Sequence, residues 1–123
     1  MKRDMELIRE LMLAIESRDD TEYWAEDLEI SGDRDIAEIK GHLQLLVDAG
    51  FIKATVNEDN GSNSPYILID RMLHNGHEFI DNASSEPVWK GVMKQVQEKG
   101  GSISIAILTQ LLIAETKRLF GLS

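Results

Sequence analysis

The chain has 123 residues, 42% of them hydrophobic, with a formal net charge of −9 and no cysteine. This length allows one core of ordinary size and excludes two large domains. The lack of cysteine excludes disulfides and thiolate zinc sites, and it favours a reducing compartment. The first residues lead into an acid-rich helix and not into a continuous apolar run, so we expect no secretory signal and a cytoplasmic protein.

Charge is distributed unevenly along the chain. Residues 1–50 carry 6 Lys and Arg against 14 Asp and Glu, residues 51–84 carry 2 against 5, and residues 85–123 carry 5 against 3. A surface that binds duplex DNA needs Lys and Arg to neutralise phosphates, because counterion release supplies much of the affinity. The acidic body therefore disfavours double-stranded DNA as a partner, and only the C-terminal part is mildly basic.

The first predicted elements are a helix over residues 4–17 and a short strand over residues 23–30. Apolar residues recur at three- and four-residue spacing in the helix, and Asp4 is placed to cap its N-terminus. Apolar and polar residues alternate in the predicted strand, so Leu28 and Ile30 are expected to face inward. We expect it to pair with the hairpin that follows.

A second helix is predicted from a cap at Asp33 to about residue 49, where Gly50 provides a stop. One arc of this helix is apolar and expected to be buried: Ile36, Ile39, Leu43, Leu46 and Val47. The opposite arc is the candidate interaction surface, formed by Arg34, Glu38, Gly41, Leu45 and Asp48.

Two interpretations of this opposite arc remain open. A helix that reads the major groove presents Arg, Lys, Asn and Gln to base edges. This arc offers one Arg, two acids and the apolar Leu45, which favours a protein contact centred on Leu45 at least as much. Leu45 can equally be one of the many isolated apolar residues found on protein surfaces.

A hairpin and a further helix follow. Residues 51–56 and 66–70 are predicted as two strands joined by a polar loop, and residues 73–80 as the helix after them. The loop, residues 57–65, contains no Lys or Arg. Hairpin loops that contact DNA generally need a cation for the phosphates or the minor groove, so we expect a plain solvated loop.

The C-terminal part is predicted to form two helices. Ser85 caps the first, which ends at Gly100, and the second runs from about residue 104 to 120. The main apolar arc of the final helix comprises Ile105, Leu108, Leu111, Leu112 and Leu119. Apolar residues outside that arc form the candidate oligomer surface: Ile107, Ile113 and Phe120. We expect either a homodimer through these helices or packing of the final helix against the core of the same chain.

No chemical site emerges from the pattern. His74 and His77 lie three apart on a predicted helix, but no His-Glu-x-x-His motif exists and His42 belongs to another helix, so we expect neither a metal nor another cofactor. No acid stands in a motif that pairs a general acid with a general base, so we expect no enzyme. The most apolar run, residues 103–113, is shorter than the roughly 20 residues that span a membrane, so we expect no membrane partner.

Five blocks, in order along nearly the whole chain, are informative: residues 1–9, 42–52, 76–81, 88–90 and 99–102. Together they resemble an uncharacterised family of small bacterial proteins, often carried by phages and prophages and catalogued as a domain of unknown function. The resemblance implies a small intracellular, phage- or prophage-associated protein with no assigned activity.

A second resemblance concerns the fold. Residues 43–51 and 73–80 are similar to the third helix and the post-wing segment of winged-helix regulators. The fold class is therefore α+β, mainly helical, with a winged-helix-like domain over residues 1–84 (helix, short strand, helix, two-stranded wing, helix) and a C-terminal helical hairpin over residues 85–123. No clear second helix precedes the helix capped at Asp33, so the helix-turn-helix of that family is truncated here.

Three functions remain in play, and an enzyme, which we do not expect, ranks third. The first is a non-enzymatic, winged-helix-like interaction module that binds another protein, which the acidic surface, Leu45 and the apolar final helix favour. The alternative is a DNA-binding transcriptional regulator, dimeric through its final helices. Its obvious cations would be Arg34, Lys40 and the lysines of the C-terminal part.

Overall fold

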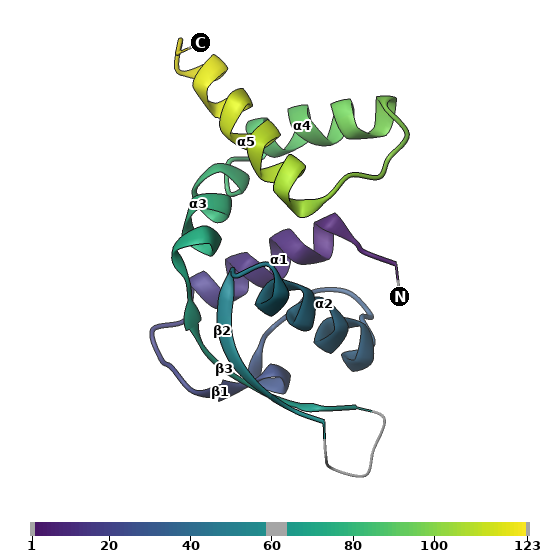
Figure 1. The fold of residues 1–123 in the computed structure, drawn as a ribbon, viewed down its shortest axis with the longest axis vertical. Coiled ribbons are helices and arrows are strands. Elements are labelled where there is room, and N and C mark those ends of the chain that lie inside the picture. The colour runs from purple at the N-terminus through teal and green to yellow at the C-terminus, as the bar shows by residue number, and fades with distance from the viewer. Residues whose placement is uncertain (1, 59–63, 123) are drawn as a thin grey trace. The chain divides into compact units, whose positions relative to one another are not determined.

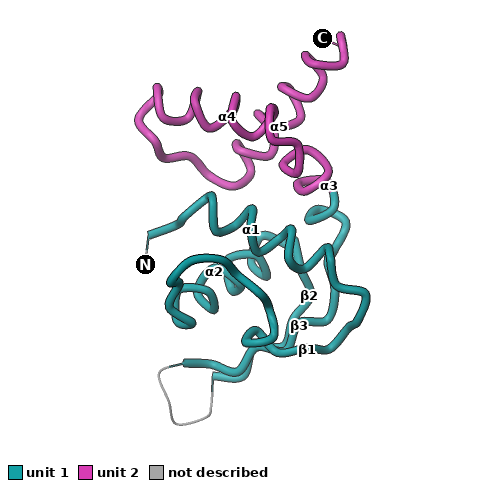
Figure 2. The backbone as a smooth tube through the Cα atoms, turned by 180° about the vertical axis from the view of Figure 1, so that it is seen from behind, with its two compact units in different colours: residues 1–77 teal, residues 78–123 magenta. Residues whose placement is uncertain are grey.

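The computed structural model describes residues 2–58 and 64–122. Two compact units are present, Met1–His77 and Glu78–Ser123 (Figure 2), and the division between them falls inside helix α3, His74–Ala83. The expected α+β, mainly helical class is confirmed, since the described residues contain five α-helices, one 3-10 turn and a three-stranded antiparallel sheet. The centre of the predicted hairpin loop, residues 59–63, lies outside the described residues.

Helix α1, Met5–Glu16, begins at Asp4 as expected. The Asp4 carboxylate accepts hydrogen bonds from the backbone N–H groups of Glu6 and Leu7, which the first turn of a helix leaves without internal partners. The buried face of the helix comprises Leu7, Ile8, Leu11, Met12 and Ile15. Four of them, all except Leu7, follow the predicted three- and four-residue spacing. Helix α1 therefore forms part of the core of the first unit.

The predicted strand over residues 23–30 is wrong in length. Strand β1 contains only Tyr23 and Trp24, and the 3-10 turn η1, Ala25–Asp27, follows at once. The cause is local, because the carboxylate of Asp27 accepts a hydrogen bond from the backbone N–H of Trp24 at 3.0 Å and closes the chain into a turn. Leu28 is still buried, whereas Ile30 is only partly covered.

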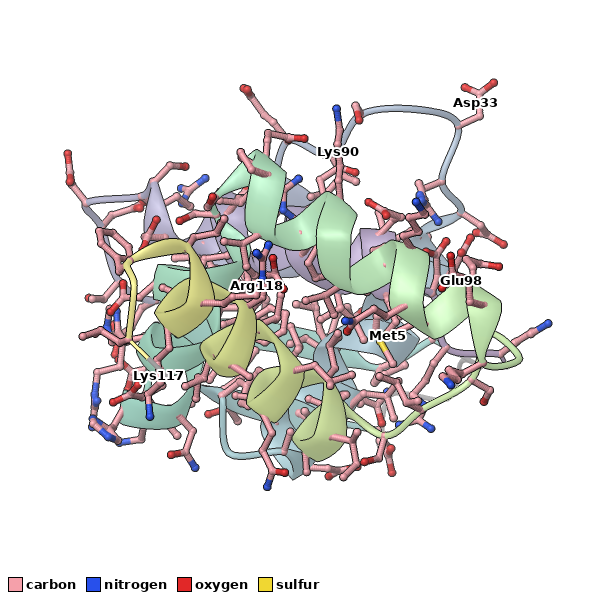
Figure 3. All side chains as sticks on the ribbon, turned by 90° about the horizontal axis from the view of Figure 1, so that it is seen from above. Met5, Asp33, Lys90, Glu98, Lys117 and Arg118 are labelled. Carbon is pink, nitrogen blue, oxygen red and sulfur yellow. The ribbon has the colours of Figure 1, made fainter. Side chains whose placement is uncertain are left out.

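Helix α2, Ile36–Asp48, is capped by Asp35 and not by Asp33 as predicted. The Asp35 carboxylate accepts from the N–H of Ala37, while Asp33 lies on the preceding loop with its side chain pointing outward (Figure 3). Because the helix starts late, Ile36 occupies its exposed first position, contrary to expectation. Gly50, with a φ of 73°, ends the helix as predicted.

The sheet has the strand order β1-β3-β2. Strands β2, Ile52–Asn57, and β3, Tyr66–Met72, form the predicted antiparallel hairpin, with an irregularity between Lys53 and Ala54. Strand β1 pairs with β3, which confirms the expected pairing with the hairpin. Helices α1 and α2 lie on one side of this sheet (Figure 1).

The second unit contains α4, Glu86–Glu98, and α5, Ile105–Leu119. Ser85 caps α4, with Pro87 in the first turn, as predicted. The buried residues of the two helices form one apolar cluster: Val88, Trp89, Val92, Val96, Ile105, Leu108 and Leu112. Leu119, which was expected in the buried arc, is exposed in the last turn of α5.

Candidate interaction surface

Arg34, the cation of the predicted interaction face, lies on the loop before α2 and not on the helix, because Asp35 caps the helix, and Arg34 is engaged within the chain. Its Nη1 donates to Oδ2 of Asp4 at 2.6 Å and to Oε1 of Glu38 at 3.1 Å. Two carboxylates therefore surround one guanidinium, and a phosphate would have to displace them. This part of the arc has little positive charge to offer to DNA.

Asp4, the cap of α1, contacts both the loop before α2 and α2 itself. Besides Arg34, its backbone N–H donates to Nε2 of His42, which is fully buried. Partial burial alone would raise the pKa of the Asp4 carboxyl, but the hydrogen bond from Arg34 and the N–H groups of Leu7 and Glu6 outweigh it and hold this pKa below its ordinary value. Asp4 is therefore a charged, structural cap.

Lys40, a second cation that a DNA reader could use, is buried in the first unit. The residue is only 4% exposed, and its Nζ lies 3.0 Å from Oε2 of Glu26 and 3.0 Å from Oγ of Ser64. These partners lie on η1 and on the segment before β3, so the ammonium joins three parts of the unit. A buried cation paired in this way is structural and cannot reach phosphates.

The remaining residues of the predicted face differ in accessibility. Asp48 is exposed at the end of α2, whereas Leu45 and Glu38 are each partly covered. An apolar anchor at a protein interface normally stands in a larger exposed apolar area. The arc offers one half-buried leucine among charged residues, which is a modest surface for a partner.

The sheet carries a surface that sequence reasoning missed. Trp24 on β1 and Tyr66 on β3 are 49% and 55% exposed, and their rings form an edge-to-face pair with centroids 6.3 Å apart and planes inclined by 63°. Successive side chains of a strand alternate between faces. Because Tyr23, Ile67 and Ile69 are buried, Trp24 and Tyr66 lie on the face of the sheet opposite the core.

A cleft of about 430 Å³ lies beside this pair, lined by Trp24, Glu26, Asp27 and Tyr66. We call these four residues the acidic aromatic cleft. Burial is the largest single influence on the pKa of Glu26 and would raise it, but the hydrogen bond from Lys40, a backbone hydrogen bond and the charge of Lys40 together outweigh burial and lower that pKa. The carboxylate therefore stays ionised at neutral pH. The cleft therefore combines two exposed aromatic rings with two negative charges.

The second unit exposes the apolar residues of the predicted oligomer surface unevenly. Ile107 is 46% exposed and Phe120 is 77% exposed, whereas Ile113 is partly covered. Leu119 and Leu122 add to the exposed apolar area near the end of α5. The predicted surface is thus accessible at Ile107 and Phe120, and it extends further than the sequence pattern indicated.

The histidines and the helices offer no further site in the residues that the structure describes. His74 and His77 are exposed on α3, and no group of three or more His, Asp or Glu side chains within residues 2–58 and 64–122 is arranged to hold a metal ion. Among the described helices, none combines the length and the apolar composition needed to cross a membrane.

Comparisons with known proteins place the chain in a family. The family model described as hypothetical protein (DUF2513) matches residues 2–102, which extends from before α1 to just past the end of α4. An uncharacterized protein of Haemophilus influenzae is 30% identical over 112 residues, covering 90% of this chain and 92% of that protein. No solved structure matches. The chain belongs to the DUF2513 family of hypothetical proteins.

Proposed function

We propose that this protein is a non-enzymatic, winged-helix-like module that binds another protein through the acidic aromatic cleft. The order helix, short strand, helix and two-stranded hairpin supports the winged-helix interpretation. The turn η1 lies where a complete helix-turn-helix would have its second helix, which supports a role other than reading DNA. The proposal includes the phage or prophage association that the sequence resemblance implies.

The observation that carries the proposal is the exposure of Trp24 and Tyr66 on one face of the sheet. Large aromatic side chains are costly to leave in water, and residues of these two types dominate the energetic centres of protein interfaces. Both are about half exposed and contact each other, so they form one patch and not two isolated residues. A protein partner that covers this patch would bury an apolar centre surrounded by a polar rim.

Charge favours a protein over duplex DNA as the partner. Residues 1–77 carry 8 Lys and Arg against 17 Asp and Glu. Of the cations in this unit, Arg34 is paired with two carboxylates and Lys40 is buried. The alternative of a DNA-binding regulator would have to rely on other cations, such as Lys90 and Lys94 on the exposed side of α4.

A comparative capture experiment tests the proposal. The tagged protein is exposed to nuclease-treated lysate from cells that naturally contain it, beside the variant carrying both Trp24→Ala and Tyr66→Ala. We expect the wild-type protein to retain a partner that the double variant loses. Ile36→Ala is the control, because it removes an exposed apolar side chain of the same unit outside the residues that line the cleft, and it should retain the partner.

A titration with random duplex DNA tests the alternative. We expect no binding tighter than the roughly 10⁻⁴–10⁻⁶ M range of non-specific binders at physiological salt. Sub-micromolar affinity with a steep salt dependence, together with equal capture by wild type and double variant, would favour the DNA-binding regulator and refute the proposal.

A further inference from the structure

We infer that the acidic aromatic cleft receives an arginine side chain from a positively charged segment of the partner protein. The inference rests on the proposed function and names the chemistry of the partner at the same site. The cleft residues Trp24, Tyr66, Glu26 and Asp27 supply aromatic faces and carboxylates side by side, and this combination matches a guanidinium group.

The ring geometry leaves aromatic surface free for a cation. In an edge-to-face pair, one ring presents its edge to the other, so the faces of the ring that gives the edge are not covered by its neighbour. Trp24 and Tyr66 are arranged in this way and each is about half exposed. A guanidinium within about 6 Å of such a ring centroid is attracted by the ring quadrupole.

The carboxylates retain capacity for a ligand. Oε2 of Glu26 pairs with Lys40, and Oδ2 of Asp27 accepts the N–H of Trp24. Each carboxylate has a second oxygen that can accept further hydrogen bonds. Lys40 is buried whereas the Glu26 side chain is 53% exposed, so a ligand approaching the cleft meets the negative partner of this pair and not the positive one.

The charge of the whole unit supports a cationic ligand. The excess of Asp and Glu over Lys and Arg in residues 1–77 creates a negative field that raises the local concentration of cationic segments and speeds their association. Arginine fits the cleft better than lysine, because its planar fork stacks on aromatic rings and donates several hydrogen bonds to carboxylates at once.

The chain itself contains the same arrangement nearby. The guanidinium of Arg18 lies 4.1 Å from the centroid of the Tyr23 ring and donates two hydrogen bonds to the carboxylate of Asp20. Arg18 also donates to the backbone carbonyl of Asp27, at 3.0 Å. An aromatic ring beside a carboxylate therefore already binds an arginine in this unit, and the cleft offers a second such combination without an arginine among its lining residues.

The test uses the full-length protein and three blocked tetrapeptides: tetra-arginine, tetra-lysine and uncharged tetra-citrulline. The chain has two tryptophans, one exposed in the cleft and one buried in the second unit, so its two indole N–H signals in a ¹⁵N–¹H spectrum report on separate places. We expect tetra-arginine to shift the Trp24 signal saturably and to leave the Trp89 signal in place, while tetra-citrulline shifts neither.

Calorimetry on variants locates the binding energy. Trp24→Ala should weaken tetra-arginine binding about fivefold or more, as loss of a cation–π contact predicts. Asp27→Asn removes one negative charge from the cleft while its side-chain oxygen can still accept the Trp24 N–H, and it should weaken binding about threefold. Glu58→Gln makes the same change of charge at an exposed residue of the same unit, outside the residues that line the cleft, and should have a smaller effect.

Other outcomes overturn the inference in distinguishable ways. Equal affinity for tetra-arginine and tetra-lysine, unaffected by Trp24→Ala, would show general attraction to an acidic protein and no arginine site. No saturable shift of the Trp24 signal, combined with capture of a partner that depends on Trp24 and Tyr66, would refute the arginine ligand and leave the proposed function standing. Failure of both experiments would refute both proposals.

Discussion

The backbone N–H of Asp4 donates a hydrogen bond of 2.9 Å to Nε2 of His42, which lies 38 residues further along the chain. Because Nε2 accepts this bond, the neutral ring carries its proton on Nδ1, which lies 2.8 Å from the carbonyl oxygen of Glu38 and donates to it. Both ring nitrogens of this fully buried histidine are therefore used: Nδ1 fixes the ring within α2, and Nε2 joins α2 to the residue that caps α1.

Replacing His42 by alanine should destabilise the protein by about 2–3 kcal/mol, since it leaves the N–H of Asp4 without its partner and creates a cavity. Urea unfolding followed by circular dichroism measures the change. His77→Ala is the control, because His77 is exposed on α3, and its effect should stay within about 0.5 kcal/mol. Equal effects of the two substitutions would mean that the Asp4–His42 contact contributes nothing.

The lowered pKa of Asp4 predicts a pH dependence. A carboxyl whose pKa is lower in the folded protein than the ordinary value of 3.8 stabilises the fold fully above that value, and this contribution is lost as the pH falls through the folded-state pKa. The difference in unfolding free energy between wild type and Asp4→Asn should therefore be largest near neutral pH and shrink below about pH 4. Asparagine can still cap α1, so the comparison isolates the charge. A difference that stays constant on acidification would argue against the Arg34 pairing.

Gly76 is predicted to be intolerant of any side chain. A Cβ at this position would lie 2.3 Å from the carbonyl oxygen of Phe51 and within 3 Å of the side chains of Met72 and Met12. Gly76→Ala should therefore destabilise the protein by about 2–4 kcal/mol through overpacking against backbone that cannot move aside. Gly91→Ala is the matched control, because its added Cβ would meet only the side chain of Glu115 at ordinary contact distance. A thermal melt distinguishes the two variants, and a harmless Gly76→Ala would contradict the described packing of α3.

Local signals explain which elements could be predicted from the sequence. The caps at Asp4 and Ser85 and the stop at Gly50 depend on side chains and backbone within one turn, and all three are confirmed. Local signals could not decide whether Asp33 or Asp35 caps α2. The residue between them, Arg34, pairs with Asp4, which is 30 residues away, and such a long-range contact cannot be read from the periodicity of one helix.

The acidic aromatic cleft escaped prediction for a related reason. Trp24 and Tyr66 meet because β1 pairs antiparallel with β3, with Trp24 opposite Leu68. The register of that pairing is a property of the folded sheet, and the strand interpretation of residues 23–30 hid the turn that brings Glu26 and Asp27 beside the rings. One signal in the sequence could have indicated this surface. Successive side chains of a strand point to opposite faces, so a buried Tyr23 requires Trp24 to lie on the other face of the sheet.

We also propose that α5 mediates self-association, since Ile107 and Phe120 expose apolar area that a second copy could cover. Light scattering should then report a dimer for the wild type, and Ile107→Glu should shift it to monomer. Gln110→Glu is the control, because it adds the same charge at an exposed polar residue of α5 and should remain dimeric. A wild-type protein that stays monomeric at its highest soluble concentration would refute this proposal.

The central claim is that a protein partner binds at Trp24 and Tyr66. Photocrosslinking from the cleft tests this claim most directly. A photoreactive phenylalanine analogue replaces Trp24 in one version of the protein and Asp48, exposed at the end of α2, in another. After irradiation in cells that naturally contain the protein, we expect a discrete protein adduct from position 24 that is absent from position 48. Adducts only with nucleic acid, or equal protein adducts from the two positions, would contradict the account.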